Sequence, residues 1–110
     1  MSADQDVGGP RGAGGRPLPE HALVGLRDAF AAEVADRLPR LLALRPDASG
    51  DEVAQALRDA HTLGSSAVVL GEPAASRVAR AIERDLSSGR VGTVQKQVRE
   101  LAALLSAWTV

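Results

Sequence analysis

The sequence predicts an all-α domain, an antiparallel four-helix bundle that follows a flexible N-terminal tail. Hydrophobic residues make up 45% of the 110 residues, which is enough to bury the core of one domain. They recur at spacings of three and four along four segments, and no segment alternates apolar and polar residues as a half-buried strand would. The connections between the segments are short, as in bundles whose neighbouring helices are antiparallel.

The N-terminal segment differs from the rest in composition. Residues 1–17 contain five Gly and two Pro but few apolar residues. Burial of so little apolar surface cannot offset the entropy lost on ordering the chain. We therefore expect a flexible tail over residues 1–17 and the bundle over residues 18–110.

The first helix is expected from Pro19 to Leu44. Pro19 suits a first helical turn, because its missing N–H would have no partner there. Pro39 predicts a kink or break, since a proline inside a helix costs about 3 kcal/mol. The apolar stripe of this helix consists of Leu23, Leu26, Phe30, Val34, Leu38 and Leu41.

The second helix is expected from Asp51 to Leu70. Ser49 or Gly50 can cap its start, and Gly71 is typical of the residue that ends a helix. At about 100° per residue the centre of its apolar stripe lies near Ala60. The stripe consists of Val53, Leu57, Ala60, Gly64 and Ala67.

Two further helices complete the predicted bundle. The third is expected over Pro73–Ser88, with Pro73 in its first turn and Gly89 as its stop. The fourth is expected over Val91–Trp108, with apolar residues at alternating steps of four and three. The two stripes are Ala75, Val78, Ala79, Ile82 and Leu86, and Val94, Val98, Leu101, Leu105 and Trp108.

Composition argues against several classes of function. Aromatic residues make up 2% of the chain and the net charge is −1, so surfaces for stacking or attracting nucleic acid are nearly absent. The chain has no cysteine, which excludes disulfides and thiolate sites. No apolar run approaches the about 20 residues that span a bilayer, and the N-terminus does not resemble a secretory signal. We expect a cytoplasmic, monomeric protein that binds neither nucleic acid nor membrane and needs no metal or other cofactor.

One histidine lies where a reactive group would be useful. His61 is in the middle of the second helix, about 100° from the centre of the stripe, and is expected to be partly packed yet open to solvent. Gly64 and Ser65 lie one turn further on and are small, and Val68 follows on the same side. A glycine inside a helix costs about 1 kcal/mol relative to alanine. Either access for a partner or close packing against a neighbouring helix can explain Gly64. The only other histidine, His21, is expected to be a solvated surface residue.

The stretch around His61 resembles a known signature. Its sequence, AHTLGSSAVVLG over residues 60–71, is similar to the pattern His-x-Leu-Lys-Gly-Ser-Ser-x-x-Leu-Gly of histidine-containing phosphotransfer (HPt) domains. Ala81-Ile82-Glu83 followed by Ser88-Gly89 is similar to a second pattern of that family. The resemblance covers residues from about 20 to 110 and implies a four-helix phosphoryl carrier of two-component phosphorelays.

The resemblance implies a role for two residues. His61 would accept a phosphoryl group from an aspartyl phosphate on one ring nitrogen and pass it on, because a neutral imidazole is nucleophilic near pH 7. Glu83 would accept a hydrogen bond from Nδ1–H and so orient the ring. Without the resemblance, a solvated Glu83 paired with Arg80 or Arg84 would be favoured.

Two residues depart from the family pattern. Gly64 stands where the family has a lysine that helps to hold the phosphoryl oxygens, and Ser65 stands where it has glycine. The positive charge would then come from another residue or from the partner, since receiver domains bring their own Mg²⁺ and lysine. The candidates in this chain are Arg58, Arg77, Arg80 and Arg84.

The leading hypothesis is a stoichiometric phosphoryl carrier with no catalytic turnover. Its partner would be a response-regulator receiver domain, a histidine kinase or both. The residues expected to contact this partner are Leu57, Arg58, Gly64, Ser65 and Val68. The main alternative is a binding module that holds a response regulator without phosphotransfer. A purely structural helical bundle, or a domain of a larger chemotaxis-type kinase, also remains open.

Overall fold

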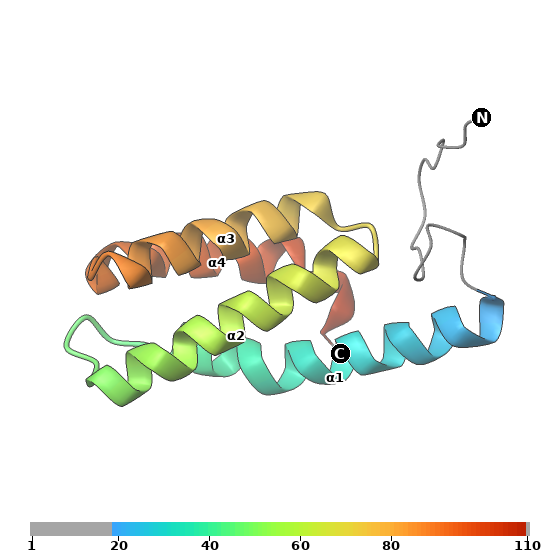
Figure 1. Ribbon diagram of the computed structural model, residues 1–110, viewed down its shortest axis with the longest axis horizontal. Helices are drawn as coiled ribbons and strands as arrows, with labels where there is room; N and C mark the ends of the chain where they lie inside the picture. Colours follow the sequence, from blue (N-terminus) through green and yellow to red (C-terminus); the bar gives the residue numbers. More distant parts are fainter. Residues whose placement is uncertain (1–18, 110) are drawn as a thin grey trace.

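The computed structural model describes residues 19–109, which form four α-helices and two single 3-10 turns (Figure 1). Within these residues there is no strand. The colours in Figure 1 show that the chain reverses its direction from each helix to the next. The predicted all-α, four-helix fold is confirmed, whereas the tail predicted for residues 1–17 lies outside the described residues. The helices are α1 (Glu20–Leu42), α2 (Gly50–Val69), α3 (Pro73–Ser87) and α4 (Val94–Leu104).

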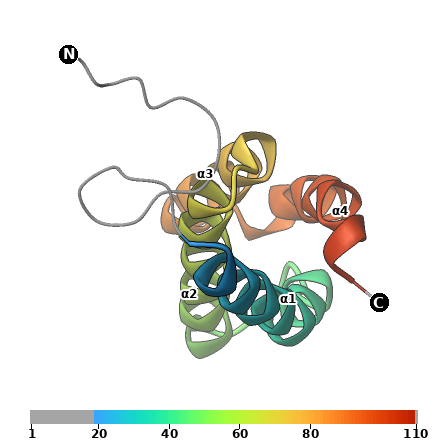
Figure 2. The same ribbon diagram turned by 90° about the vertical axis from the view of Figure 1, so that its right-hand side faces the viewer.

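The helices surround one apolar core. Viewed along the bundle, α2 lies between α1 and α3, and α4 lies on the far side from α2 (Figure 2). Each helix contributes buried apolar residues to the core, and α2 and α3 contribute mainly alanine where they face each other. Phe30 of α1 and Trp108 of the 3-10 turn η3 (Ser106–Trp108) meet edge to face, with ring centroids 4.7 Å apart.

The ends of the helices follow local sequence rules. Ser49 caps α2: its Oγ accepts from the Glu52 backbone N–H at 3.1 Å, and the Glu52 carboxylate accepts from the Ser49 N–H at 2.8 Å. This reciprocal pair satisfies two N–H groups that the helix itself leaves unpaired. Gly71 and Gly89 follow α2 and α3 with φ angles of +75° and +79°. These angles favour glycine, and so both residues end their helices as predicted.

Two helix boundaries differ from the sequence prediction. Helix α1 continues through Pro39 and ends at Leu42. Because Pro39 lies on the exposed side in the last turn, the hydrogen bond that it removes leaves a carbonyl that water can reach. The predicted fourth helix is divided into the 3-10 turn η2 (Val91–Thr93), α4 and η3. The apolar spacing is continuous across all three, which is why the sequence predicted one helix.

The buried face of α2 is wider than its predicted stripe. Ala60, Gly64 and Ala67 are buried as expected, whereas Val53 and Leu57 are only partly buried. Additional buried residues are Ala56, Asp59 and Leu63. The difference arises because α2 packs against two helices, and the side that faces α1 contains a charged residue that an apolar pattern cannot reveal. None of the described helices is both long and apolar enough to cross a bilayer.

Candidate functional site

The imidazole of His61 lies between α2 and α3. Its Nδ1 is 3.2 Å from Oε1 of Glu83, and this distance is that of a hydrogen bond in which Nδ1–H donates to the carboxylate. The His61 side chain is 70% exposed and that of Glu83 is 27% exposed. Among the described residues Nε2 has no hydrogen-bond partner. One ring nitrogen is therefore held by the protein while the other faces solvent.

A close approach of the two helices brings His61 and Glu83 together. Gly64 is buried, and a Cβ atom built on it would lie 3.1 Å from Cβ of Ala79 and 3.8 Å from the backbone oxygen of Ser76. The distance of 3.1 Å is shorter than an ordinary contact between carbon atoms. Gly64 thus lies in the close packing of α2 on α3. Its expected contact with a partner stays a prediction.

Two grooves meet at the imidazole. The first, which we call the α3 groove, has a volume of about 630 Å³. Its lining residues are His61, Ser65, Arg80, Glu83, Arg84, Ser87, Ser88 and Arg90. The second, which we call the α2 groove, has a volume of about 450 Å³. Its lining residues are Arg37, Gln55, Leu57, Arg58, His61, Thr62 and Glu83. A group that approaches the exposed side of His61 enters a surface with several basic side chains.

The model of the Hpt domain family matches residues 25–109. The chain belongs to the Hpt domain family. Hpt domains are phosphocarrier modules that interact with histidine kinases and response regulators, and this Hpt domain therefore has a histidine-phosphotransfer role in two-component signalling. Among curated proteins and among solved structures, no match to the chain was found.

The residues predicted to contact a partner precede and follow His61 along α2 in this Hpt domain. Arg58 and Ser65 are exposed, and Val68 exposes 53% of its surface. Leu57 is half-buried in the α2 groove. These four residues share one side of α2 with the imidazole, because they lie three, four or seven residues from His61.

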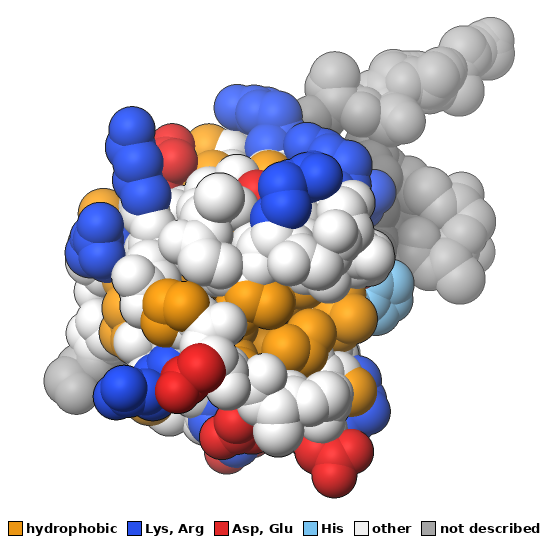
Figure 3. Space-filling model, turned by 90° about the vertical axis from the view of Figure 1, so that its left-hand side faces the viewer, with side chains coloured by type: hydrophobic (Ala, Val, Ile, Leu, Met, Phe, Trp, Pro, Cys, Tyr) orange, Lys and Arg blue, Asp and Glu red, His pale blue; other side chains and the backbone are white. Residues whose placement is uncertain are grey.

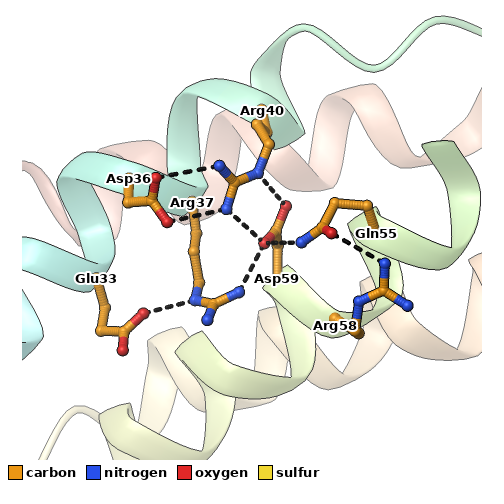
Figure 4. A network of polar contacts seen from close by, with 7 residues as sticks. All are labelled: Glu33, Asp36, Arg37, Arg40, Gln55, Arg58 and Asp59. Carbon is orange, nitrogen blue, oxygen red and sulfur yellow. Dashed lines mark hydrogen bonds and ion pairs between the residues drawn. The ribbon is translucent and has the colours of Figure 1, made fainter.

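A buried ionic network lies two residues before His61 in the sequence. Asp59 is fully buried between α2 and α1, and the side chains of Arg37, Arg40 and Gln55 donate to its carboxylate at 2.8–3.0 Å (Figure 4). Arg37 also pairs with Glu33, and Arg40 with Asp36. Sequence analysis missed this network. The only signal in the sequence was Asp59, a charged residue next to the apolar stripe. Its burial is possible because arginines of a second helix pair with it.

The network keeps Asp59 ionised. Burial alone would raise the pKa of its carboxyl, but the hydrogen bonds from Arg40, Gln55 and Arg37 outweigh burial and hold the pKa below the usual value. The pKa of Asp36 is lowered by its hydrogen bond with Arg40, and the pKa of Arg40 is raised by its hydrogen bonds with Asp59 and Asp36. The network joins α1 to the part of α2 that precedes the imidazole.

No metal centre accompanies the site in the part of the chain that the structure describes. Over residues 19–109, no group of three or more His, Asp or Glu residues lies close enough together to hold a metal ion. His61 and Glu83 are two potential ligands that contact each other directly.

Proposed function

We propose that this Hpt domain carries a phosphoryl group on Nε2 of His61 and exchanges it with an aspartate of a receiver domain. The observation that carries the proposal is the hydrogen bond between Nδ1 and Glu83 on a ring that is 70% exposed. With the proton held on Nδ1, the lone pair of the ring lies on Nε2, on the exposed side.

The transfer step joins the imidazole to the acyl phosphate of the partner. The lone pair of Nε2 attacks phosphorus, and the bond between phosphorus and the aspartyl oxygen breaks. The electron pair of this bond stays on the carboxylate of the aspartate. Nδ1 keeps its proton, so the ring becomes a cation that faces the Glu83 carboxylate. Glu83 acts as a positioning residue, and the reverse sequence returns the group to a second receiver.

Labelling with radioactive phosphate tests the carrier role. Wild-type protein is incubated with a receiver phosphorylated on its aspartate, and we expect an acid-labile, base-stable phosphate on the Hpt domain. His61→Gln should abolish the label, and the matched control His21→Gln should retain it. A label that persists in His61→Gln, or a wild type that takes none from any phosphorylated receiver or kinase, would contradict the proposal.

Stable binding without transfer is the second candidate, because Gly64 stands where the family pattern has a lysine. Receiver binding that survives His61→Ala, together with the absence of label in wild type, would select it. We also propose that the domain acts as a monomer in the cytoplasm. Light scattering at micromolar concentration is expected to give the mass of one chain.

A further inference from the structure

The α3 groove has unneutralised positive charge beside the imidazole. Arg80 donates from Nε to the uncharged Oγ of Ser76 at 3.3 Å, and Arg84 makes no side-chain hydrogen bond or ion pair within residues 19–109. Arg90, also in the lining, is paired with Asp85 at 2.8 Å. The one carboxylate in the lining belongs to Glu83, which contacts His61.

Helix α2 has no cation at the position one turn after His61. This position is Gly64, which is buried, and a Cβ atom built on it would lie 3.1 Å from Cβ of Ala79. Ser65, the next residue, is exposed and has a hydroxyl that can donate one hydrogen bond into the α3 groove. The positive charges that line this groove are Arg80 and Arg84 of α3 and Arg90, which is paired with Asp85.

The basic residues of the α2 groove differ in their partners. Arg37 is bound by Glu33 and by the buried Asp59. Arg58 donates to Oε1 of Gln55 at 2.9 Å, and Gln55 precedes Arg58 on the helix (Figure 4). This partner is uncharged, so Arg58, which lines the α2 groove with His61, is the rival cation to the arginines of α3.

The two arginines of α3 share a groove with the reactive pair. Arg80 and Arg84 are both exposed and line the α3 groove together with His61 and Glu83. In the space-filling view of the end where α3 finishes, Lys and Arg side chains gather along the α3 edge (Figure 3). A dianionic group on Nε2 would meet this positive edge.

We propose that the α3 groove is a phosphoryl-oxygen site, in which Arg84 and Arg80 bind the oxygens of phosphorylated His61 and Ser65 donates a further hydrogen bond. This inference rests on the proposed carrier function and identifies the cation that acts in it. The guanidinium group suits the role because its planar set of N–H donors can bind two oxygens at once. Both arginines stay charged throughout, and no covalent bond to them forms or breaks.

The test compares arginine variants with a small phosphodonor, phosphoramidate, so that no partner supplies the charge. The variants are Arg84→Gln, Arg80→Gln and the double variant. Arg77→Gln is the matched control, because Arg77 is exposed on the same helix but does not line the groove. Arg58→Gln tests the rival cation. Circular dichroism melts are used to verify that each variant is folded.

We expect the double variant to form phosphohistidine at least about tenfold more slowly than wild type, since one charge-assisted hydrogen bond to the transferred group has this magnitude. Arg84→Lys should recover part of the rate, because it keeps the charge but loses the two-oxygen contact. The ³¹P resonance of phosphohistidine should shift in Arg84→Gln and not in Arg77→Gln.

Two results would overturn the site, and they are distinguishable from failure of the carrier role. If wild type is labelled and the double variant matches Arg77→Gln in rate and in ³¹P shift, the groove does not bind the phosphoryl group although the carrier role stands. The α3 groove is likewise ruled out if Arg58→Gln, and no variant of Arg84 or Arg80, lowers the rate of phosphohistidine formation. If wild type cannot be labelled by a phosphorylated receiver either, the carrier role fails and the site fails with it.

Discussion

His61 exposes 70% of its side chain, whereas Glu83, its partner across the helix pair, exposes 27%. This difference assigns separate tasks to the two residues. A partner can reach the imidazole, while the carboxylate is restrained by its place between the helices and can fix the orientation of the ring. We therefore propose that Glu83 acts through His61, by holding the orientation of the imidazole.

Substitution of Glu83 should therefore affect the rate of phosphorylation more than the fold. We expect Glu83→Ala to reduce the rate of phosphohistidine formation by about 10-fold or more, as loss of an orienting partner typically does. Glu83→Gln should retain more activity, because its amide oxygen can still accept the hydrogen bond from Nδ1–H. Equal rates for Glu83→Ala and wild type, measured under identical donor concentration, would show that the contact has no part in transfer.

At the scale of the helices, the contact between α2 and α3 determines the geometry of the site. Gly64 and Ala79 allow the helices to approach until a single added carbon would lie 3.1 Å from its neighbour. The same approach places His61 within hydrogen-bond distance of Glu83. Packing and function thus depend on one contact between small residues.

Gly64→Leu should separate the two helices. We expect a loss of about 1–3 kcal/mol in the free energy of unfolding, because the side chain must enter a packed contact. Ser65→Leu, at the exposed neighbouring position, is the control and should change stability by at most about 0.5 kcal/mol. Urea denaturation of both variants provides the measurement, and similar midpoints would argue against the close approach.

The contact between α1 and α2 contains the buried carboxylate of Asp59. Three side chains donate to it, and its pKa lies below the usual value. A carboxyl whose pKa is lower in the folded than in the unfolded state stabilises the fold above the unfolded pKa of about 3.9. That stabilisation is lost as the pH falls through the folded pKa.

Asp59→Asn should lower the free energy of unfolding at neutral pH and make it depend less on pH in the acidic range. We expect a cost of about 1–3 kcal/mol at pH 7, because arginine donors would then face an uncharged amide. Below the unfolded pKa of about 3.9 the difference from wild type should shrink, as protonation removes the advantage of Asp59. Asp36→Asn, at an exposed residue that also pairs with Arg40, is the control and should cost less than about 1 kcal/mol. Thermal melts from pH 2 to pH 7 that run parallel for Asp59→Asn and wild type would contradict this account.

For the whole molecule, the question is which face meets a partner. Val68 is a large apolar residue that is 53% exposed, and it lies seven residues after His61 on the same helix. Exposed apolar residues also occur elsewhere, as at Leu104 on α4. We propose that the face around Val68 docks the receiver because only this face includes the reactive imidazole.

A charge at Val68 should separate docking from chemistry. We expect Val68→Asp to weaken transfer from a phosphorylated receiver by about tenfold or more, since burial of an unpaired carboxylate at an interface is costly. Phosphorylation by phosphoramidate should stay within about twofold of wild type, because the reacting atoms are untouched. Leu104→Asp is the control for a distant exposed position. Equal losses with both donors would place Val68 in the site itself rather than in the docking face.

The apolar spacing of the sequence was sufficient to predict the helices and most of the core. Ser49, Gly71 and Gly89 mark helix ends through local backbone chemistry, which needs no tertiary information. The family resemblance then indicated His61 and Glu83. Their contact at 3.2 Å required the structure, because the residues are 22 positions apart and helix packing determines the distance.

The sequence by itself determined four helices, most of their buried apolar residues and a histidine beside the apolar stripe, because these depend on periodicity within single helices. Only the tertiary structure decided why Gly64 is a glycine, since both explanations fit the same sequence. It also decided that Asp59 is buried and that Arg84 and Arg80 line a groove with the imidazole. These features arise where two helices meet. The sequence of one helix does not determine which side chains of the other helix pack against it.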